Sequence, residues 1–220
     1  MITGLVINEQ EETMKTFLSI LIACFLASGI AVAQLESYPL AVDVKEKSVL
    51  SIQGKSNVVD FKFYQPGERF IRKKMYITAS RRDNKLYLSE NNLEIPVKNF
   101  TSSNKMALRD FYKLVKSDEY PMMHIELDHI ELAGRPSGPV GNAVIDVTIT
   151  DVTRRYIFPV TAGKNGNNFT FDVNKEINIR DFNLTPPVHM MGLLKVDEWI
   201  TINLFMECGI LPADQAELTR

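Results

Sequence analysis

A two-residue alternation of apolar and polar side chains, repeated in short runs after Gln34, constrains the fold of this 220-residue chain more than any other feature. In the run from Val144 to Thr150, the apolar residues Ile145, Val147 and Ile149 occupy every second position. This period places them on one face of a β-strand, where they are buried. The pattern recurs at Val59-Phe61-Phe63, Ile71-Met75-Ile77, Leu86-Leu88, Met123-Ile125-Leu127, Tyr156-Phe158-Val160, Phe169-Phe171-Val173 and Ile200-Ile202-Leu204-Met206. We therefore predict a mainly β structure.

Turn-forming residues separate these runs at short intervals. Gly, Pro and Asn cluster at Gln65–Gly67, Arg82–Asn84, Gly134–Gly141 and Lys164–Asn167. About eight to ten strands with this spacing predict one domain, an antiparallel barrel or sandwich. Pro159 cannot donate a ladder hydrogen bond, so its strand is expected to be irregular or at an edge there.

One stretch has the period of a helix instead. The spacing of a single helix face is found at Leu108, Phe111, Tyr112 and Val115. Ser102, Ser103 and Asn104 offer capping oxygens before this stretch, and Pro121 blocks continuation after it. We predict one short helix over about Lys105–Lys116, lying on the surface or at one end of the β structure.

The N-terminal region has the layout of a secretory signal peptide. Residues 14–33 place Lys15 before an uncharged apolar run that ends in Ala31-Val32-Ala33. A transmembrane anchor is the competing interpretation, but the run is at the short end for crossing a bilayer and no basic flank follows it. We expect cleavage before Gln34 and export to the periplasm.

Two further features bear on processing and domain organisation. Glu9, Glu11 and Glu12 put negative charge where a signal peptide begins with positive charge, so we expect translation to start at Met14. Lipidation of Cys24 is less favoured, because the apolar run continues beyond it to Ala33. The expected organisation is an extended start and signal over 1–33, a β domain over 34–208 and a tail over 209–220.

Charge and cysteine content narrow the function classes. The signal region holds one Lys and three Glu of the 25 basic and 27 acidic residues, so the remaining chain is balanced. We therefore expect no nucleic-acid partner. The remaining chain keeps Cys208 alone, so stability must come from a core and not from a disulfide.

Three passages follow one another in an order typical of one known family. The first begins Ile95-Pro96-Val97-Lys98-Asn99-Phe100 and ends at Tyr120-Pro121. The second reads Val147-Thr148-Ile149-Thr150-Asp151-Val152-Thr153-Arg154-Arg155. The third begins Asn178-Ile179-Arg180-Asp181-Phe182-Asn183-Leu184 and continues through Gly192–Glu198 into the last strand. Together, from about Ser48 to Met206, they resemble the YceI-like, polyisoprenoid-binding family.

The resemblance implies an antiparallel, lipocalin-like β-barrel with one short surface helix and a long apolar lipid, of the polyisoprenoid or quinone type, in its lumen. A barrel of about eight strands is just wide enough to be filled by side chains or to hold one slender ligand. The residues expected to face the lumen and bind the lipid are Phe61, Phe63, Met75, Ile77, Met123, Ile125, Leu127, Ile145, Val147, Ile149, Phe158, Phe169, Phe171, Ile202 and Leu204.

The chain departs from the family's pattern at two places. Val59 and Phe61 stand where relatives that read Gly-Thr-Ser-x-x-His-Asp-Trp have His and Trp. Asp151 replaces the usual glycine of the turn after the second passage. The resemblance therefore implies no role for His and Trp side chains at the first place.

Other residue groups point less clearly to a site. A basic stretch could face a lipid phosphate or form a solvated strand face, the interpretation that we favour; its members are Lys62, Arg69, Arg72, Lys73, Lys74, Arg81, Arg82 and Lys85. His124 and His129 should lie on opposite strand faces, so we expect no metal site. Arg180-Asp181 is interpreted as a structural ion pair.

The leading hypothesis is therefore a periplasmic lipid carrier without cofactor or catalytic residues, since no motif of nucleophilic, phosphate-binding or metal-dependent catalysis occurs. The alternative is a non-catalytic barrel filled by its own side chains, which binds another protein at its surface. The hypothesis leaves open a transient contact with a membrane and assembly into a homodimer.

Overall fold

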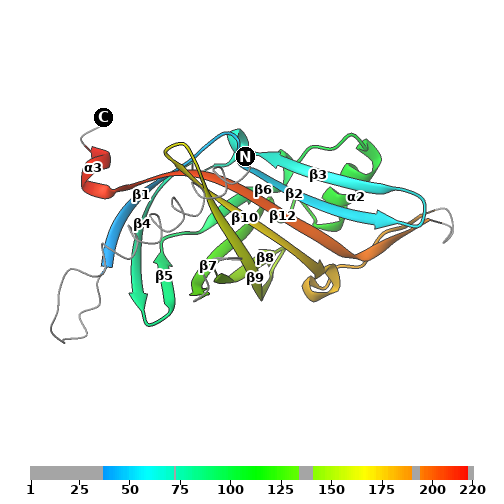
Figure 1. Ribbon diagram of the computed structural model, residues 1–220. Helices are drawn as coiled ribbons and strands as arrows, with labels where there is room; N and C mark the ends of the chain where they lie inside the picture. Colours follow the sequence, from blue (N-terminus) through cyan, green and yellow to red (C-terminus); the bar gives the residue numbers. More distant parts are fainter. Residues whose placement is uncertain (1–36, 72, 134–140, 190–193, 218–220) are drawn as a thin grey trace, which may run out of the picture.

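The structure, a computed structural model, describes residues 37–71, 73–133, 141–189 and 194–217 (Figure 1). The predicted signal peptide and its cleavage site lie outside these residues. The strands are β1 (Ser37–Val44), β2 (Val49–Ser56), β3 (Asp60–Pro66), β4 (Lys74–Arg82), β5 (Lys85–Ser89), β6 (Leu93–Pro96), β7 (Met122–Leu132), β8 (Gly141–Ile149), β9 (Val152–Asn165), β10 (Asn168–Asn178), β11 (Val188–His189) and β12 (Leu194–Pro212).

Helices are few, so the predicted mainly β class is confirmed. The α-helices are α2 (Lys105–Leu114) and the short α3 (Ala213–Glu217), and the 3-10 helices are η1 (Gly67–Arg69), η2 (Val97–Asn99) and η3 (Ile179–Phe182). The predicted helix is confirmed as α2, and of the three proposed capping residues Asn104 is the N-cap. Among the described residues, no helix combines the length and the apolar character needed to span a bilayer.

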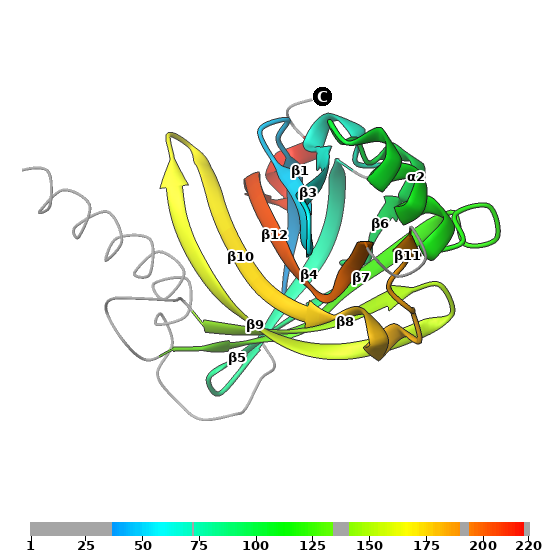
Figure 2. The ribbon, with the colours of Figure 1, turned by 90° about the vertical axis from the view of Figure 1, so that its right-hand side faces the viewer.

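The strands form a closed antiparallel ring. Hydrogen-bonded neighbours follow the order β1-β4-β5-β7-β8-β9-β10-β12, and a direct β1–β12 pairing closes it. This is the antiparallel, lipocalin-like arrangement that the family resemblance implied. In Figure 2, the ring is seen with α2 on the side of β6 and β7, away from the β9–β10 hairpin.

Two long strands change partners along their length, which divides the ring into two ends. β12 pairs with β1 through Cys208–Pro212 and with β2 through Val196–Phe205. β7 pairs with β5 through His129–Glu131 and with β6 through Met122–Ile125. We call the part around β1, β4 and β5 the closed end and the part around β2, β3 and β6 the open end.

We call this end open because the sheet is interrupted there. The hydrogen-bonded order stops at β3, and β6 lies off this path. An isolated bridge between Tyr64 and Thr101 joins β3 to the segment that follows η2. Helix α2 lies beside this part of the ring (Figures 1 and 2).

The closed end is packed with apolar side chains. Val42, Ile77, Ile145 and Phe158 are each less than a tenth exposed and belong to one continuous core. Cys208 is also buried there, and burial raises the pKa of its thiol to about 12. Dense packing of this kind leaves few voids, so the closed end has the character of a protein core.

Pro159 lies within β9, opposite Asn142 of β8. The pairing of β9 with β10 includes Val160 but does not reach Pro159. At Pro159, β9 therefore pairs with β8 and not with β10, which suits a residue that has no N–H to donate.

At the other end of the domain, β12 continues through Gly209–Pro212. These residues pair with β1, although the sequence analysis left them to a tail.

Candidate ligand-binding site

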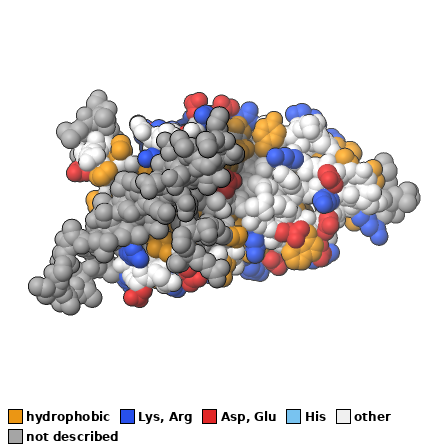
Figure 3. Space-filling view, viewed as in Figure 1, with side chains coloured by type: hydrophobic (Ala, Val, Ile, Leu, Met, Phe, Trp, Pro, Cys, Tyr) orange, Lys and Arg blue, Asp and Glu red, His pale blue; other side chains and the backbone are white. Residues whose placement is uncertain are grey.

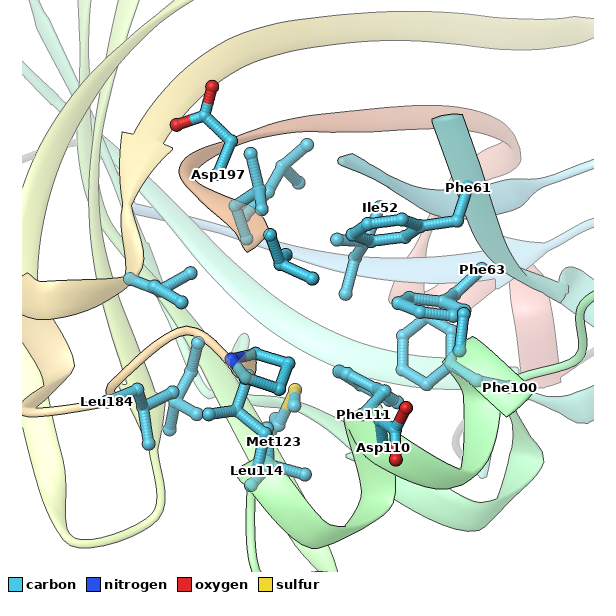
Figure 4. Close-up of a pocket in the computed structure, with 18 of the residues that line it drawn as sticks. Ile52, Phe61, Phe63, Phe100, Asp110, Phe111, Leu114, Met123, Leu184 and Asp197 are labelled. Carbon is cyan, nitrogen blue, oxygen red and sulfur yellow. The ribbon is translucent and has the colours of Figure 1, made fainter. Parts of the chain in front are cut away.

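A cavity of about 130 Å³ lies inside the open end (Figure 4). Its lining comes from β2, β3, β6, α2, β7, β8, η3 and β12, so every part of the open end contributes. The volume is roughly ten times that needed to hold one water molecule and similar to the ~150 Å³ of an engineered cavity that binds benzene. The cavity therefore has room for a hydrocarbon group.

Aromatic rings form one wall of the cavity. Phe63 on β3 stacks against Phe111 on α2 with ring centroids 4.7 Å apart, and Phe100 meets Phe111 edge to face at 5.5 Å. Phe61 lies beside Phe63 at 5.2 Å. Figure 4 shows these four side chains grouped between β3 and α2. Such pairs add about 0.5–1.5 kcal/mol each beyond area burial, so the wall also holds the helix to the sheet.

Hydrogen bonds fix α2 across the interrupted sheet. The Asn104 side chain accepts from the backbone N–H of Ala107 at 3.0 Å, which caps the first turn. The Tyr112 hydroxyl donates to the carbonyl of Phe100 at 2.9 Å, and burial raises the pKa of this tyrosine. The Ser102 hydroxyl donates to the Lys62 carbonyl of β3 at 2.7 Å. The helix is thereby attached at both sides of the gap.

Apolar side chains dominate the chemistry of the lining. Polar side chains enter it at Ser56, Asn104, Asp110 and Asp197, and the remaining lining side chains are aliphatic, aromatic or Met. Each buried CH₂ of a ligand contributes about 0.8 kcal/mol, so a hydrocarbon can bind here through area alone. Val59 and Met106 are about half exposed, at 49% and 53%, and mark the rim of the cavity.

The structure brings together about half of the residues predicted to face a lumen. Those that line the cavity are Phe61, Phe63, Met123, Ile125, Val147, Ile149 and Ile202. The others lie elsewhere in the ring, and are Met75, Ile77, Leu127, Ile145, Phe158, Phe169, Phe171 and Leu204. The lumen is thus accessible at one end and occupied by side chains at the other; a role in binding for each lining residue stays a prediction.

Several lining residues were not anticipated. Leu50 and Ile52 of β2 alternate with polar neighbours, and this pattern could have identified them. Phe111 and Val115 were recognised as one helix face, but the sequence does not reveal that this face borders a cavity. Ile179 and Leu184 lie in and after η3, where no strand or helix period predicts the direction of a side chain.

The other candidate groups lie apart from the cavity. No described member of the basic stretch is among the lining residues, and Arg69 and Lys85 instead contact the Asn99 carbonyl and Glu131. Arg180 pairs with Glu198, and Asp181 accepts a 2.8 Å hydrogen bond from Tyr156, so the predicted Arg180-Asp181 pair is replaced by two separate contacts. In the described part of the chain, no three His, Cys, Asp or Glu side chains gather as a metal would require.

Fold and site together define a class: lipocalin-like proteins in which an antiparallel ring of strands encloses an apolar cavity at one end. The family comparison identifies the family within this class. The model of the YceI-like domain matches residues 73–208, and the chain belongs to the YceI-like family. The matched segment includes α2 and most strands that line the cavity, whereas β2 and β3 precede it.

The chain is similar to solved structures at low sequence identity. BcnA from Burkholderia cenocepacia is 20% identical with a TM-score of 0.55, over 75% of this chain and 99% of that one. A polyisoprenoid binding domain from Saccharophagus degradans is 6% identical with a TM-score of 0.49, over 78% and 98%. The YceI protein of Campylobacter jejuni is 12% identical with a TM-score of 0.42, over 82% and 87%. A search among curated proteins finds no significant match.

Proposed function

We propose that this protein is a periplasmic carrier that binds a polyisoprenoid or a similar long apolar lipid without chemically converting it. The apolar cavity at the open end carries the proposal, because it is enclosed by buried hydrocarbon and offers little for directional polar recognition. Membership of the YceI-like family supports it. The filled-scaffold alternative requires a solid interior, and the cavity favours the carrier.

The size of the cavity suggests how a long lipid is held. A volume of about 130 Å³ takes a short part of a polyprenyl chain and not its whole length. One end of the lipid therefore occupies the cavity, and the rest passes the rim at Val59 and Met106, whose exposed apolar side chains cover it.

The direct test is extraction of the native protein. The processed chain is purified from the periplasm of a bacterial host, extracted with organic solvent and analysed by mass spectrometry, and the delipidated protein is titrated with a fluorescent polyprenyl probe. We expect a co-purified apolar lipid and saturable binding of the probe. Absence of both results would refute the carrier function. Intact mass tests the location, since export with cleavage leaves Gln34 as the first residue.

A matched pair of variants links binding to the cavity. Ala107→Phe adds a ring at a lining position of α2 and should weaken probe binding by roughly tenfold or more. Ala41→Phe makes the same change on β1, opposite Leu211 and Tyr76, which are both exposed. This control should bind like the unmodified protein. Equal affinities of the two variants would place the lipid outside the cavity.

A further inference from the structure

Exposed apolar side chains gather at the mouth of the cavity. We define the mouth as the segments around the rim, which are residues 55–60, 104–113, 187–188 and 195–197. Of the ten large hydrophobic side chains that are exposed among the described residues, four belong to it: Val58, Val59, Met106 and Val188. Val58 and Val188, at 70% and 59%, are the most exposed of the ten. A group of exposed apolar side chains beside a cavity marks an interaction surface.

Hydrogen bonds hold two of these segments together. The Ser56 hydroxyl accepts from the backbone N–H of Val59 at 3.0 Å and so fixes the turn between β2 and β3. In this turn, the Asn57 N–H donates to the Lys195 carbonyl at 3.2 Å, and the Asn57 side chain accepts from the Lys195 N–H at 2.9 Å. Lys195 pairs with Val188 across β11 and β12. The valines of the β2–β3 turn and of β11 therefore belong to one patch. Figure 1 places this turn, α2 and the start of β12 toward the same end of the molecule.

The geometry of the β2–β3 turn does not call for apolar residues. Turns favour Gly, Pro, Asn, Asp and Ser, and Ser56 and Asn57 already meet this preference. Val58 and Val59 are β-branched residues of the kind that pack in strands, yet they lie in water at the tip. Covering them would remove apolar area from water, which is favourable. The turn is thus suited to contact with an apolar partner.

A row of basic side chains on α2 borders this patch. The row consists of Lys105, Arg109 and Lys113, which are exposed and spaced four residues apart, so they share one side of the helix. Met106 and Arg109 are three residues apart and are therefore neighbours on the helix surface. Apolar and positively charged groups thus lie next to each other at the mouth. In Figure 3, hydrophobic side chains and Lys or Arg side chains both reach the surface over this end of the molecule.

The mouth is positively charged although the whole chain is not. Its basic side chains are Lys55, Lys105, Arg109, Lys113 and Lys195, and its acidic ones are Asp60, Asp110 and Asp197. Five against three leave a net charge of +2, whereas the whole chain has −2. Asp197 also accepts a hydrogen bond from the Trp199 N–H at 3.0 Å, and Asp60 lies opposite Lys55 across β2 and β3. The surface around the cavity therefore complements a negatively charged partner.

Resting on the carrier function proposed above, we propose that the mouth docks on the surface of an anionic phospholipid bilayer, from which the apolar ligand enters the cavity. Valine side chains enter the boundary between headgroups and acyl chains, and the cations contact lipid phosphates. A long apolar lipid resides in a bilayer, so a cavity that faces the bilayer receives it without exposing it to water.

A bilayer fits the mouth better than a protein partner does. Protein interfaces draw most of their binding energy from Trp, Tyr and Arg side chains that fill pockets. The exposed apolar side chains of the mouth are instead three Val and one Met. A symmetric contact with a second copy of the chain would bring two positively charged mouths together. A bilayer requires only apolar area and positive charge, and the mouth offers both.

The test measures how the processed, delipidated protein partitions onto lipid vesicles in a co-sedimentation assay. Vesicles of phosphatidylcholine with one third phosphatidylglycerol are compared with vesicles of phosphatidylcholine alone at low salt. We expect roughly tenfold stronger binding to the anionic vesicles, because each Lys or Arg near such a surface strengthens binding by roughly fivefold and the acidic side chains of the mouth offset part of this. Added salt should reduce the difference, because it screens exposed charges.

Two variants locate the docking surface without changing the cavity lining. Val58→Ser, Val188→Ser removes apolar area, and Lys105→Gln, Arg109→Gln, Lys113→Gln removes charge while it keeps the helix propensity. Each should weaken binding to the anionic vesicles by roughly tenfold. Uptake of the polyprenyl probe from these vesicles should slow in parallel. Direct titration with the probe should show unchanged affinity, since none of the five residues lines the cavity.

Matched controls make the same changes away from the mouth. Tyr76→Ser, Leu211→Ser replaces two exposed side chains that flank β1. Lys47→Gln, Lys74→Gln, Lys164→Gln removes three exposed charges outside the mouth. Both controls should bind anionic vesicles within about twofold of the unmodified protein, because distant charges are screened. Thermal melts verify that every variant is folded.

The outcomes separate this inference from the proposed function. If anionic vesicles are not bound, or if the mouth variants and their controls lose binding equally, the docking surface is overturned, and probe titration then still decides the carrier function. A dimer in sedimentation velocity that only the mouth variants dissociate also overturns it, because the patch then contacts a second copy of the chain. If vesicles bind through the mouth but the probe does not bind, the carrier function fails, and the passage of a lipid from bilayer to cavity fails with it.

Discussion

At the scale of single residues, Gly54 shapes the cavity by having no side chain. It pairs with Phe61 across β2 and β3, and the ring of Phe61 covers it. A Cβ at Gly54 would lie 2.4 Å from the tip of that ring, far inside contact distance. The ring must therefore move to make room for a Cβ. Because Phe61 also lines the cavity, this movement can push the ring into it.

Gly54→Ala should therefore reduce lipid binding more than stability. We expect probe affinity to fall by roughly tenfold and the free energy of unfolding to fall by about 1 kcal/mol. Titration with the polyprenyl probe and a urea melt measure the two effects. Gly209→Ala is the control, because its added Cβ has no neighbour closer than 3.4 Å. A variant at Gly54 with full affinity would show that the ring moves away from the cavity.

Glu207 is a second single residue that we expect to affect the stability of the protein. It is buried where β12 changes partner from β2 to β1, and its carboxylate accepts from Asn168 at 2.7 Å and from Asn165 at 3.3 Å. The hydrogen bond from Asn168 is the main reason that the pKa of this carboxyl is lowered. The carboxylate thus joins the β9–β10 turn to β12.

The lowered pKa of Glu207 predicts a loss of stability in acid. A carboxyl with a lower pKa in the folded state stabilises the protein fully above its unfolded pKa, and this stabilisation disappears as pH falls through the folded pKa. We expect Tm to decline below about pH 4.5, with a shallower decline in Glu207→Gln. Calorimetry from pH 7 to 3 measures it, with Glu176→Gln on the exposed side of β10 as the control. Parallel curves for Glu207→Gln and the unmodified protein would contradict the assignment.

At the scale of elements, α2 covers the interrupted part of the sheet. Its N-cap, Asn104, offers a way to loosen the first turn of the helix by one substitution. Asn104→Ala removes the acceptor for Ala107 and should cost about 1 kcal/mol, or roughly 2–4 °C in Tm. Loosening the first turn should also speed release of the probe, which stopped-flow displacement measures. Ser103→Ala changes an exposed neighbour outside the helix and serves as the control. Unchanged release in Asn104→Ala would show that α2 does not gate the cavity.

How far the sequence predicts these elements depends on whether the signal is local. Alternation predicts β8, β10 and β12, and helical spacing with a polar cap predicts α2, because each needs only neighbouring residues. The register shift in β7 between Leu127 and His129 does not show in the alternation. The change of partner along β12 and β7 depends on distant segments, so the sequence predicts a ring but not its two ends.

At the scale of the whole molecule, we expect the closed end to contribute mainly to stability and the open end mainly to binding. The closed end is packed, hydrogen-bonded on all sides of the ring and free of a role in the cavity lining. At the open end, the sheet is interrupted between β3 and β6, and the isolated Tyr64–Thr101 bridge and helix α2 take its place. Side-chain packing of α2 replaces the missing sheet contact, so a fully paired ring supports an end that a helix covers.

Ile145 and Ile149 make this division testable on one strand. Both lie on β8, belong to the same hydrophobic core and have similar burial, 8% and 6% exposed, yet Ile149 also lines the cavity and Ile145 does not. Ile145→Ala should cost about 2–5 kcal/mol, as a buried truncation in a packed core does. Ile149→Ala should cost less, because that side chain already borders empty space and has fewer contacts to lose.

Binding should change in the opposite order. Ile149→Ala enlarges the cavity and should alter the affinity for polyprenyl probes of different bulk, whereas Ile145→Ala should leave every affinity unchanged while the protein is folded. Urea melts of the delipidated variants give the stabilities, and probe titrations below the melting transition give the affinities. Equal losses of stability, or equal changes in affinity, would mean that the ring behaves as one uniform core. The unequal result would mean that residues which look identical in the sequence differ in role because they lie on different sides of the point where β7 and β12 change partners.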